Sequence, residues 1–152
     1  MKHRGLSCSV EVLCGCTRSL EFVIVARILI VDDEESDRVL ERTILERQGH
    51  KVYVAVNGEE ALREYVGKGI EVVITDLQMP KVHGFELITV LRDFSPQPSI
   101  IAVSGTGPEQ LDMANALGAK FTLRKPIDPD RLIAAVEQVL AVRARSARDD
   151  SV

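Results

Sequence analysis

The sequence predicts an α/β fold, a doubly wound parallel sheet of five strands in the order 2-1-3-4-5 with five helices. The alternation of two hydrophobic patterns along the chain predicts it. Short apolar runs alternate with segments whose hydrophobic residues recur at helical spacing. Such alternation is typical of a parallel sheet covered by helices on both faces. At 152 residues the chain is long enough for one domain with a proper core. The predicted strands are 27–31, 52–56, 70–75, 99–103 and 121–123.

Each predicted strand is followed by a segment with one apolar helical face. Gly49 and Gly67 fit helix stops, and Pro96 and Pro98 fit a connection where a helix cannot continue. The residues expected on the five faces are, in chain order, Val39, Leu40, Thr43 and Ile44; Ala61, Leu62, Tyr65 and Val66; Leu87, Val90, Leu91 and Phe94; Leu111, Ala114 and Leu117; and Leu132, Val136, Val139 and Leu140.

The same patterns divide the chain into three parts. Residues 1–25 show no sustained periodicity, and we interpret them as an N-terminal extension outside the domain, either disordered or the product of a start codon placed too early. Residues 26–143 form the predicted domain, and residues 144–152 form a polar C-terminal tail. Strands 52–56 and 121–123 are expected at the sheet edges because they are the most polar or the shortest.

Composition excludes several classes of function. The formal net charge of −4 argues against nucleic acid as a partner, since phosphate contacts need a basic surface. No apolar run approaches the roughly 20 residues that span a bilayer, so we expect no membrane partner and a cytoplasmic location. Three cysteines, Cys8, Cys14 and Cys16, fall in the first sixteen residues, and we interpret them as incidental.

Polar side chains follow four of the predicted strands. Asp32 and Asp33 follow the first strand, Asp76 the third, Ser104 the fourth and Lys125 the fifth. In a doubly wound sheet, ligands bind outside the carboxyl ends of the central strands. Three carboxylates, a hydroxyl and an ammonium are therefore expected to meet at one edge of the sheet.

This set of side chains suits phosphoryl and metal chemistry. Three crowded carboxylates raise each other's pKa values unless a cation lies among them. Oxygen ligands of this kind suit Mg²⁺ or Mn²⁺. A carboxylate can also attack phosphorus and form an aspartyl phosphate. The metal, the lysine and the hydroxyl would then stabilise the charge on the transferred group.

Four separated motifs carry a family resemblance. They read "ILIVDDEESDR", "VVITDLQMPKVHGFEL", "IIAVSGTG" and "GAKFTLRKPID". In this order and spacing they resemble the receiver domain of response regulators in two-component signalling, over about residues 26–143. The resemblance implies a flavodoxin-like fold.

The resemblance also implies roles for the acidic residues. Asp76 matches the phosphate acceptor. Asp32 and Asp33 match the acidic pair that binds Mg²⁺, with Asp33 as the direct ligand and Asp32 acting through water. Asp76 itself and the backbone carbonyl of Gln78 would complete the protein's share of the metal coordination.

Further positions match the family, and one departs from it. Ser104 matches the hydroxyl that bonds the phosphoryl group and moves on activation. Lys125 matches the lysine that pairs with a phosphoryl oxygen, and Lys125–Pro126 is expected to be a cis peptide. Thr122 stands where an aromatic residue often couples phosphorylation to the output face. Phe121 is adjacent but should point to the other side of its strand, so coupling is expected to run mainly through Ser104 and the loop after it.

These matches predict a stand-alone, single-domain response regulator, a monomer or weak dimer. A histidine kinase or a histidine phosphotransfer protein would donate to Asp76. A downstream target would bind the face formed by the fourth helix, fifth strand and fifth helix. Two alternatives remain, a non-phosphorylated adaptor and an aspartyl-phosphate phosphohydrolase. The second is disfavoured because it needs Asp-x-Asp, whereas Leu77 and Gln78 follow Asp76. His83 is expected to be exposed in the loop rather than catalytic.

Overall fold

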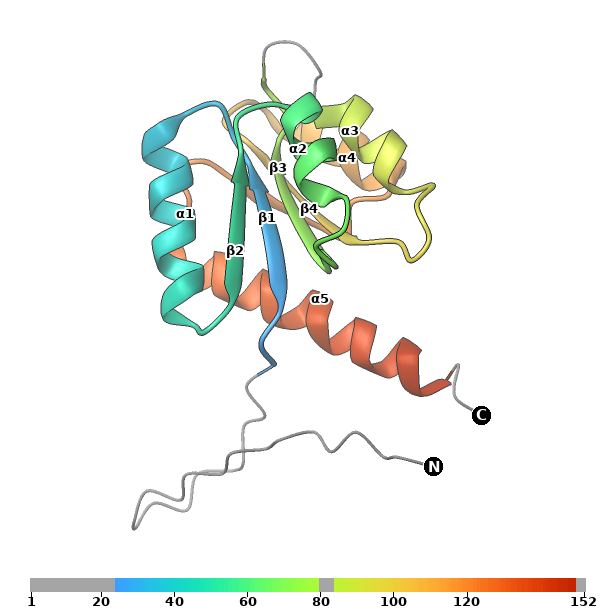
Figure 1. Ribbon diagram of the computed structural model, residues 1–152. Coiled ribbons are helices and arrows are strands. Elements are labelled where there is room, and N and C mark those ends of the chain that lie inside the picture. The colour runs from blue at the N-terminus through green and yellow to red at the C-terminus, as the bar shows by residue number, and fades with distance from the viewer. Residues whose placement is uncertain (1–23, 80–83, 150–152) are drawn as a thin grey trace, which may run out of the picture.

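Five parallel strands form one sheet in the order β2-β1-β3-β4-β5, with helices packed on both faces (Figure 1). The structure is a computed structural model that describes residues 24–79 and 84–149. The strands are β1 (Arg27–Val31), β2 (Lys51–Ala55), β3 (Val72–Asp76), β4 (Ser99–Ser104) and β5 (Phe121–Arg124). The helices are α1 (Glu35–Arg47), α2 (Gly58–Tyr65), α3 (Gly84–Leu91), α4 (Pro108–Leu117) and α5 (Pro129–Asp149). The predicted fold class and strand order are confirmed.

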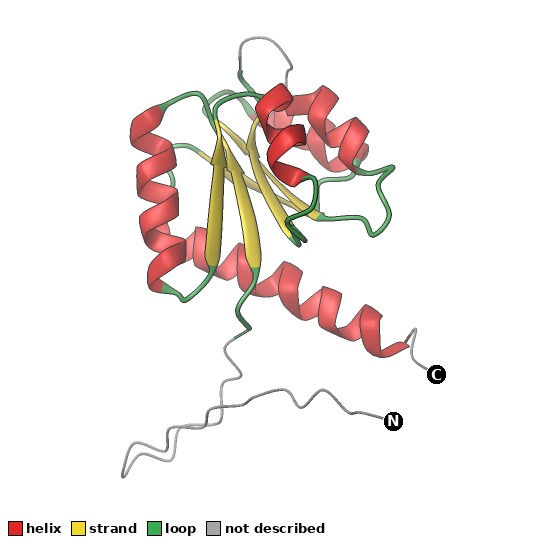
Figure 2. Ribbon diagram, in the orientation of Figure 1, coloured by secondary structure: helices red, strands yellow, loops and turns green. Residues whose placement is uncertain are grey.

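The sheet separates two hydrophobic clusters. Helices α1 and α5 cover one face, and α2, α3 and α4 cover the other (Figure 2). Side chains alternate along each strand, so Ile30 and Ile74 pack on the α1–α5 side, whereas Leu29 and Val73 pack on the α2–α4 side. Strands β1 and β3 pair in parallel with Ile30 opposite Ile74, so residues that lie opposite each other in the two strands point to the same face of the sheet. This register also controls which residues meet at the carboxyl ends of the strands.

The edge positions of β2 and β5 agree with their composition. Strands β3 and β4 are buried along their whole length, as expected for central strands of a parallel sheet. Residues Phe121 to Leu123 of β5 are only half-buried. Phe121 packs with the α1–α5 cluster and not with the opposite one, in agreement with its predicted direction.

The predicted apolar face of α1 is wrong at Val39, Leu40 and Thr43, whereas Ile44 packs against the α1–α5 cluster. Val39 and Leu40 are 57% and 42% exposed, whereas Glu41 and Leu45 are buried. The hydrophobic periodicity predicted the wrong face because the two apolar residues Val39 and Leu40 point away from the sheet. In the first turn of α1, the Arg38 guanidinium donates to the Asp32 carbonyl oxygen at 2.7 Å and so ties the helix to the end of β1.

Helix α5 is longer than predicted. Asp128 caps its start, since its carboxylate accepts from the backbone N–H of Asp130 at 2.9 Å. The segment 144–149, expected in the polar tail, continues the helix. The Arg143 guanidinium donates to the Gln97 carbonyl oxygen at 2.8 Å, so this side chain ties the helix to the loop before β4.

Some predictions fall outside the described residues. They concern Cys8, Cys14, Cys16, His83 and the extension 1–25, of which only residues 24 and 25 are described. Among the helices of 24–79 and 84–149, none has the length and apolar character needed to cross a membrane.

Gly84 joins α3 closely to the end of β3. A Cβ at this position would lie 2.3 Å from the carbonyl oxygen of Asp76 and 2.7 Å from the Cα of Leu77. Both are backbone atoms that cannot move aside without shifting β3. A side chain is therefore excluded here by the approach of the backbone that carries Asp76.

Candidate functional site

Three carboxylates converge at the carboxyl edge of the sheet. Asp32, Asp33 and Asp76 each offer an oxygen, and these oxygens all lie within 4.8 Å of one another. Asp32 follows β1 directly and Asp76 is the last residue of β3, two neighbouring strands. Asp32 and Asp76 are buried, whereas Asp33 is exposed. The predicted acidic cluster is thus brought together by strands that are far apart in sequence.

The ammonium of Lys125 lies among these carboxylates. Its Nζ atom donates to Oδ2 of Asp32 at 2.8 Å, to Oδ2 of Asp37 at 2.7 Å and to Oδ2 of Asp76 at 3.0 Å. Lys125 follows the edge strand β5, and its backbone N–H donates to the Ser104 carbonyl oxygen at 2.9 Å. The Lys125–Pro126 peptide bond is cis, as the family resemblance implied. One lysine therefore links β5 to β1, β3 and α1.

Tight turns orient the two buried carboxylates. Oδ1 of Asp32 accepts from the backbone N–H of Glu34, and Oδ1 of Asp76 accepts from the backbone N–H of Gln78, both at 2.9 Å. Each aspartate thus bonds its own backbone two residues further on, which is a habit of Asp at turns. Each then presents Oδ2 to Lys125. That the backbone carbonyl of Gln78 is a metal ligand stays a prediction.

Burial and charge act in opposite directions on this group of residues. Burial opposes the charged form of Lys125, but hydrogen bonds to Asp32, Asp37 and Asp76 outweigh it and raise the pKa of the lysine. Burial also raises the pKa of Asp32, against the lowering effect of Lys125 and of the Glu34 N–H. The oxygen-only donor set suits a divalent cation. Such a cation among the carboxylates would favour their charged forms.

Ser104 is fully buried, and its hydrogen bonds lead away from the carboxylates. Its hydroxyl donates to Oε1 of Gln110 at 3.1 Å, lies 3.0 Å from Oγ1 of Thr106 and accepts from the Thr106 backbone N–H. Thr106 also donates to Gln110 at 2.7 Å and accepts from Nε2 of Gln78 at 3.4 Å. The predicted hydroxyl is thus held by α4.

Two acidic residues of α1 were missed as site residues. Asp37 pairs with Lys125. Glu41, one turn further on, is 1% exposed, and its Oε2 has no hydrogen-bond partner among the described residues. Burial, and secondarily the charge of Asp32, raise the pKa of Glu41 to about 8. Positions 37 and 41 share one helical face, but that spacing alone does not show which residues the face meets.

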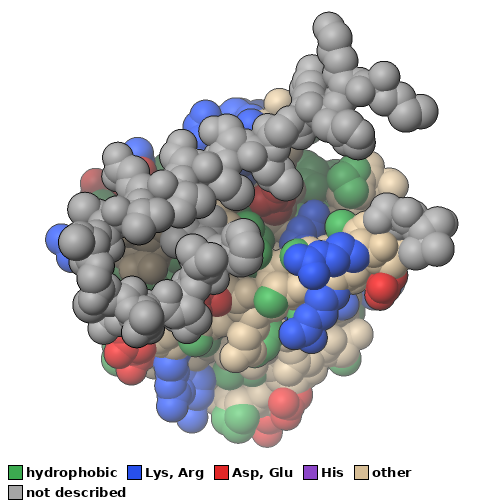
Figure 3. All heavy atoms as spheres, turned by 90° about the horizontal axis from the view of Figure 1, so that it is seen from below, with side chains coloured by type: hydrophobic (Ala, Val, Ile, Leu, Met, Phe, Trp, Pro, Cys, Tyr) green, Lys and Arg blue, Asp and Glu red, His purple; other side chains and the backbone are tan. Residues whose placement is uncertain are grey.

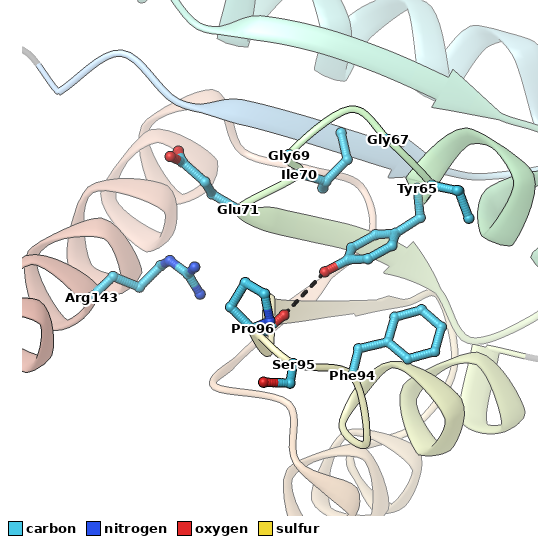
Figure 4. Close-up of a pocket in the computed structure, with 10 residues that line it drawn as sticks. Tyr65, Gly67, Gly69, Ile70, Glu71, Phe94, Ser95, Pro96 and Arg143 are labelled. Carbon is cyan, nitrogen blue, oxygen red and sulfur yellow. Dashed lines mark hydrogen bonds between the residues drawn. The ribbon is translucent and has the colours of Figure 1, made fainter.

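The opposite edge of the sheet holds a cavity without such chemistry. It measures about 580 Å³ and lies among Tyr65, Phe94, Pro96 and Arg143 (Figure 4). Tyr65 packs against Phe94 and its hydroxyl donates to the Pro96 carbonyl oxygen. From below, basic side chains lie beside hydrophobic ones on the visible surface (Figure 3). The described residues that line this cavity form no such cluster of carboxylates, so the acidic cluster at the carboxyl edge is the better candidate site.

Comparison with known proteins identifies the family of the chain. The family model of the response regulator receiver domain matches residues 28–137, from β1 into α5. The chain belongs to this family, the receiver domains of bacterial two-component response regulators. In particular, it is similar to chemotaxis protein CheY of Thermotoga maritima, with 32% identity over 115 residues that cover 74% of this chain and 96% of that protein.

Other relatives extend the comparison. The crystal structure of chemotaxis response regulator CheY4 of Vibrio cholerae matches with a TM-score of 0.70 and 32% identity, covering 76% of this chain and 99% of that one. The autoinducer 1 sensor kinase/phosphatase LuxN of Vibrio campbellii is 37% identical over 91 residues, which are 59% of this chain. The chain spans only 11% of the length of that relative.

The buried carboxyl of Glu41 predicts a pH dependence of stability. Its folded-state pKa of about 8 exceeds the ordinary value of 4.5, so between these pH values the folded protein holds a proton that the unfolded chain has lost. Its contribution to stability is therefore present below pH 4.5 and is lost as the pH rises toward 8. Glu41→Leu should raise the free energy of unfolding by about 1–3 kcal/mol at neutral pH. The gain should increase as the pH is raised to 8, and urea denaturation at several pH values measures it.

The control for this measurement is Glu46→Leu on the same helix. Glu46 is exposed and pairs with Arg42, so its loss should change stability by less than about 0.5 kcal/mol. A Glu41→Leu protein that is less stable than the wild type at every pH would contradict the interpretation.

Proposed function

We propose that Asp76 accepts a phosphoryl group from the phosphohistidine of a histidine kinase or a histidine phosphotransfer protein. The observation that carries this proposal is the pairing of the Asp76 carboxylate with Lys125 at 3.0 Å, beside two further carboxylates. Membership of the receiver-domain family supports it. The sensor kinase LuxN among the relatives also suggests this signalling context.

The transfer needs little from the protein beyond position and charge. A carboxylate oxygen of Asp76 attacks phosphorus, the phosphorus–nitrogen bond of the phosphohistidine breaks, and the ring nitrogen of the histidine leaves and takes a proton from solvent. The product is an aspartyl phosphate. Lys125 donates to an oxygen of the transferred group and offsets its charge. The mounting of Asp76 on a buried strand keeps the nucleophile in one orientation.

The carboxylates fit a magnesium ion. We propose that Asp32, Asp33 and Asp76 hold Mg²⁺ or Mn²⁺, together with the backbone carbonyl of Gln78. The oxygens of the three aspartates lie within 4.8 Å of one another, and a set of oxygen ligands without nitrogen or sulfur suits these ions. When bound, the ion supplies positive charge to the oxygens of the transferred phosphoryl group. Exposure of Asp33 leaves this ligand accessible from solvent.

The proposed output of the site runs through α4 to the face formed by α4, β5 and α5. A phosphoryl oxygen that bonds the Ser104 hydroxyl would compete with Gln110 on α4. Thr122 offers no aromatic ring for coupling, and Phe121 packs in the α1–α5 cluster. This supports coupling through Ser104 and the loop after it. NMR shift changes on phosphorylation that spare α4 would contradict this route.

Asp76→Asn is expected to abolish labelling of the protein by a small phosphodonor such as phosphoramidate. The amide cannot form the aspartyl phosphate. Intact-mass spectrometry should show a gain of one phosphoryl group in the wild type that is lost in acid or base, and none in the variant. Asp93 is an exposed aspartate two residues after α3, and Asp93→Asn should label like the wild type. Stoichiometric labelling of Asp76→Asn would refute the assignment and favour another acceptor.

Asp33→Ala is expected to weaken Mg²⁺ binding at least roughly tenfold, since even partners behind a metal ligand typically contribute that much. The chain contains no Trp, so calorimetric titration is the suitable measurement. Glu34→Ala removes the neighbouring exposed acid and should cause a smaller loss. Equal affinities for the wild type and Asp33→Ala would remove Asp33 from the metal site.

A further inference from the structure

Asp37 is a fourth carboxylate at the site, and the family resemblance assigns it no role. It lies in the first turn of α1, and its Oδ2 is 2.7 Å from Nζ of Lys125. Its side chain is 34% exposed, compared with 2% for Asp32 and 6% for Asp76. Asp37 does not belong to the group of three carboxylates that could share a metal ion. Its contact at the site is with the lysine.

The ammonium of Lys125 has no donor to spare. A lysine carries three N–H donors, and the ammonium makes hydrogen bonds with Asp32, Asp37 and Asp76. A phosphoryl oxygen on Asp76 can therefore bond Lys125 only by replacing one of these carboxylates. Asp76 is the carboxylate that loses its own charge when it becomes an acyl phosphate. Asp37 then keeps a full negative charge on the same ammonium.

We infer that Asp37 is a positioning residue that competes with the phosphoryl group for Lys125, and thereby lowers the affinity of the site for that group. This inference rests on the proposed function of Asp76. A carboxylate at this place has opposite effects on two ligands, because it attracts a cation and repels an anion. Asp37 thus strengthens Mg²⁺ binding and weakens phosphoryl retention, which favours return or onward transfer of the group.

The test compares Asp37→Asn with Glu35→Gln in the full chain. Both variants remove one negative charge from the first turn of α1, but the ion pairs of Lys125 in the described structure involve Asp32, Asp37 and Asp76, not Glu35. Calorimetry measures the affinity for Mg²⁺ alone, and then for beryllofluoride, a phosphoryl mimic, at saturating Mg²⁺. Asp37→Asn should bind beryllofluoride several-fold more tightly and Mg²⁺ several-fold more weakly. Glu35→Gln should change both affinities much less.

The opposite directions distinguish positioning from a structural role. If both affinities of Asp37→Asn fall together, or neither changes, the inference is wrong. Asp37→Ala is the second variant, since it removes the charge without leaving an amide, and it should agree with Asp37→Asn in sign. If wild-type protein is labelled on Asp76 but these variants behave like it, the inference alone fails. If the wild type takes neither label nor beryllofluoride, the proposed function fails and the inference with it.

Discussion

The ammonium of Lys125 is the charge on which the arrangement of the site depends. It comes from the end of an edge strand and bonds carboxylates at the ends of β1 and β3 and in the first turn of α1. Removing one partner of a buried ion pair leaves an uncompensated charge and typically costs about 3–5 kcal/mol. Asp32 and Asp76 can be buried side by side because this cation lies between them. The lysine is therefore a structural requirement of this arrangement.

The location of the site follows from the parallel sheet. Alternation along β1, β3 and β5 directs Ile30, Ile74 and Leu123 to the α1–α5 face. Two residues further on, Asp32, Asp76 and Lys125 continue the same alternation, which explains how α1 can supply Asp37 and Glu41 to the neighbourhood of the site. The sheet core and the polar cluster are thus consecutive layers of one face. The pKa of the buried Glu41 carboxyl is therefore raised both by burial in the core and by the charge of Asp32 in the polar cluster.

Much of this could be predicted from sequence, because strand order and edge strands follow from composition and alternation. The apolar face of α5 was correct for the same reason, since Leu132, Val136, Val139 and Leu140 are all buried. The face of α1 was not. Its buried positions include Glu41, which a hydrophobic pattern cannot select. The Asp37 contact and the Gln110 bond to Ser104 depend on side-chain directions between elements distant in sequence, so no local pattern contains them.

The most direct test of the central claim is the protonation of Lys125, followed by nitrogen-15 NMR of the lysine side chains as the pH is raised. Three hydrogen-bonded carboxylates raise the pKa of Lys125 and should keep this ammonium charged well above the pH of about 10.4 at which a lysine ordinarily titrates. The persistent signal should be absent from Lys125→Met. Loss of the Lys125 signal at or below that ordinary value would show that the ammonium is not held among the carboxylates, and would contradict the account.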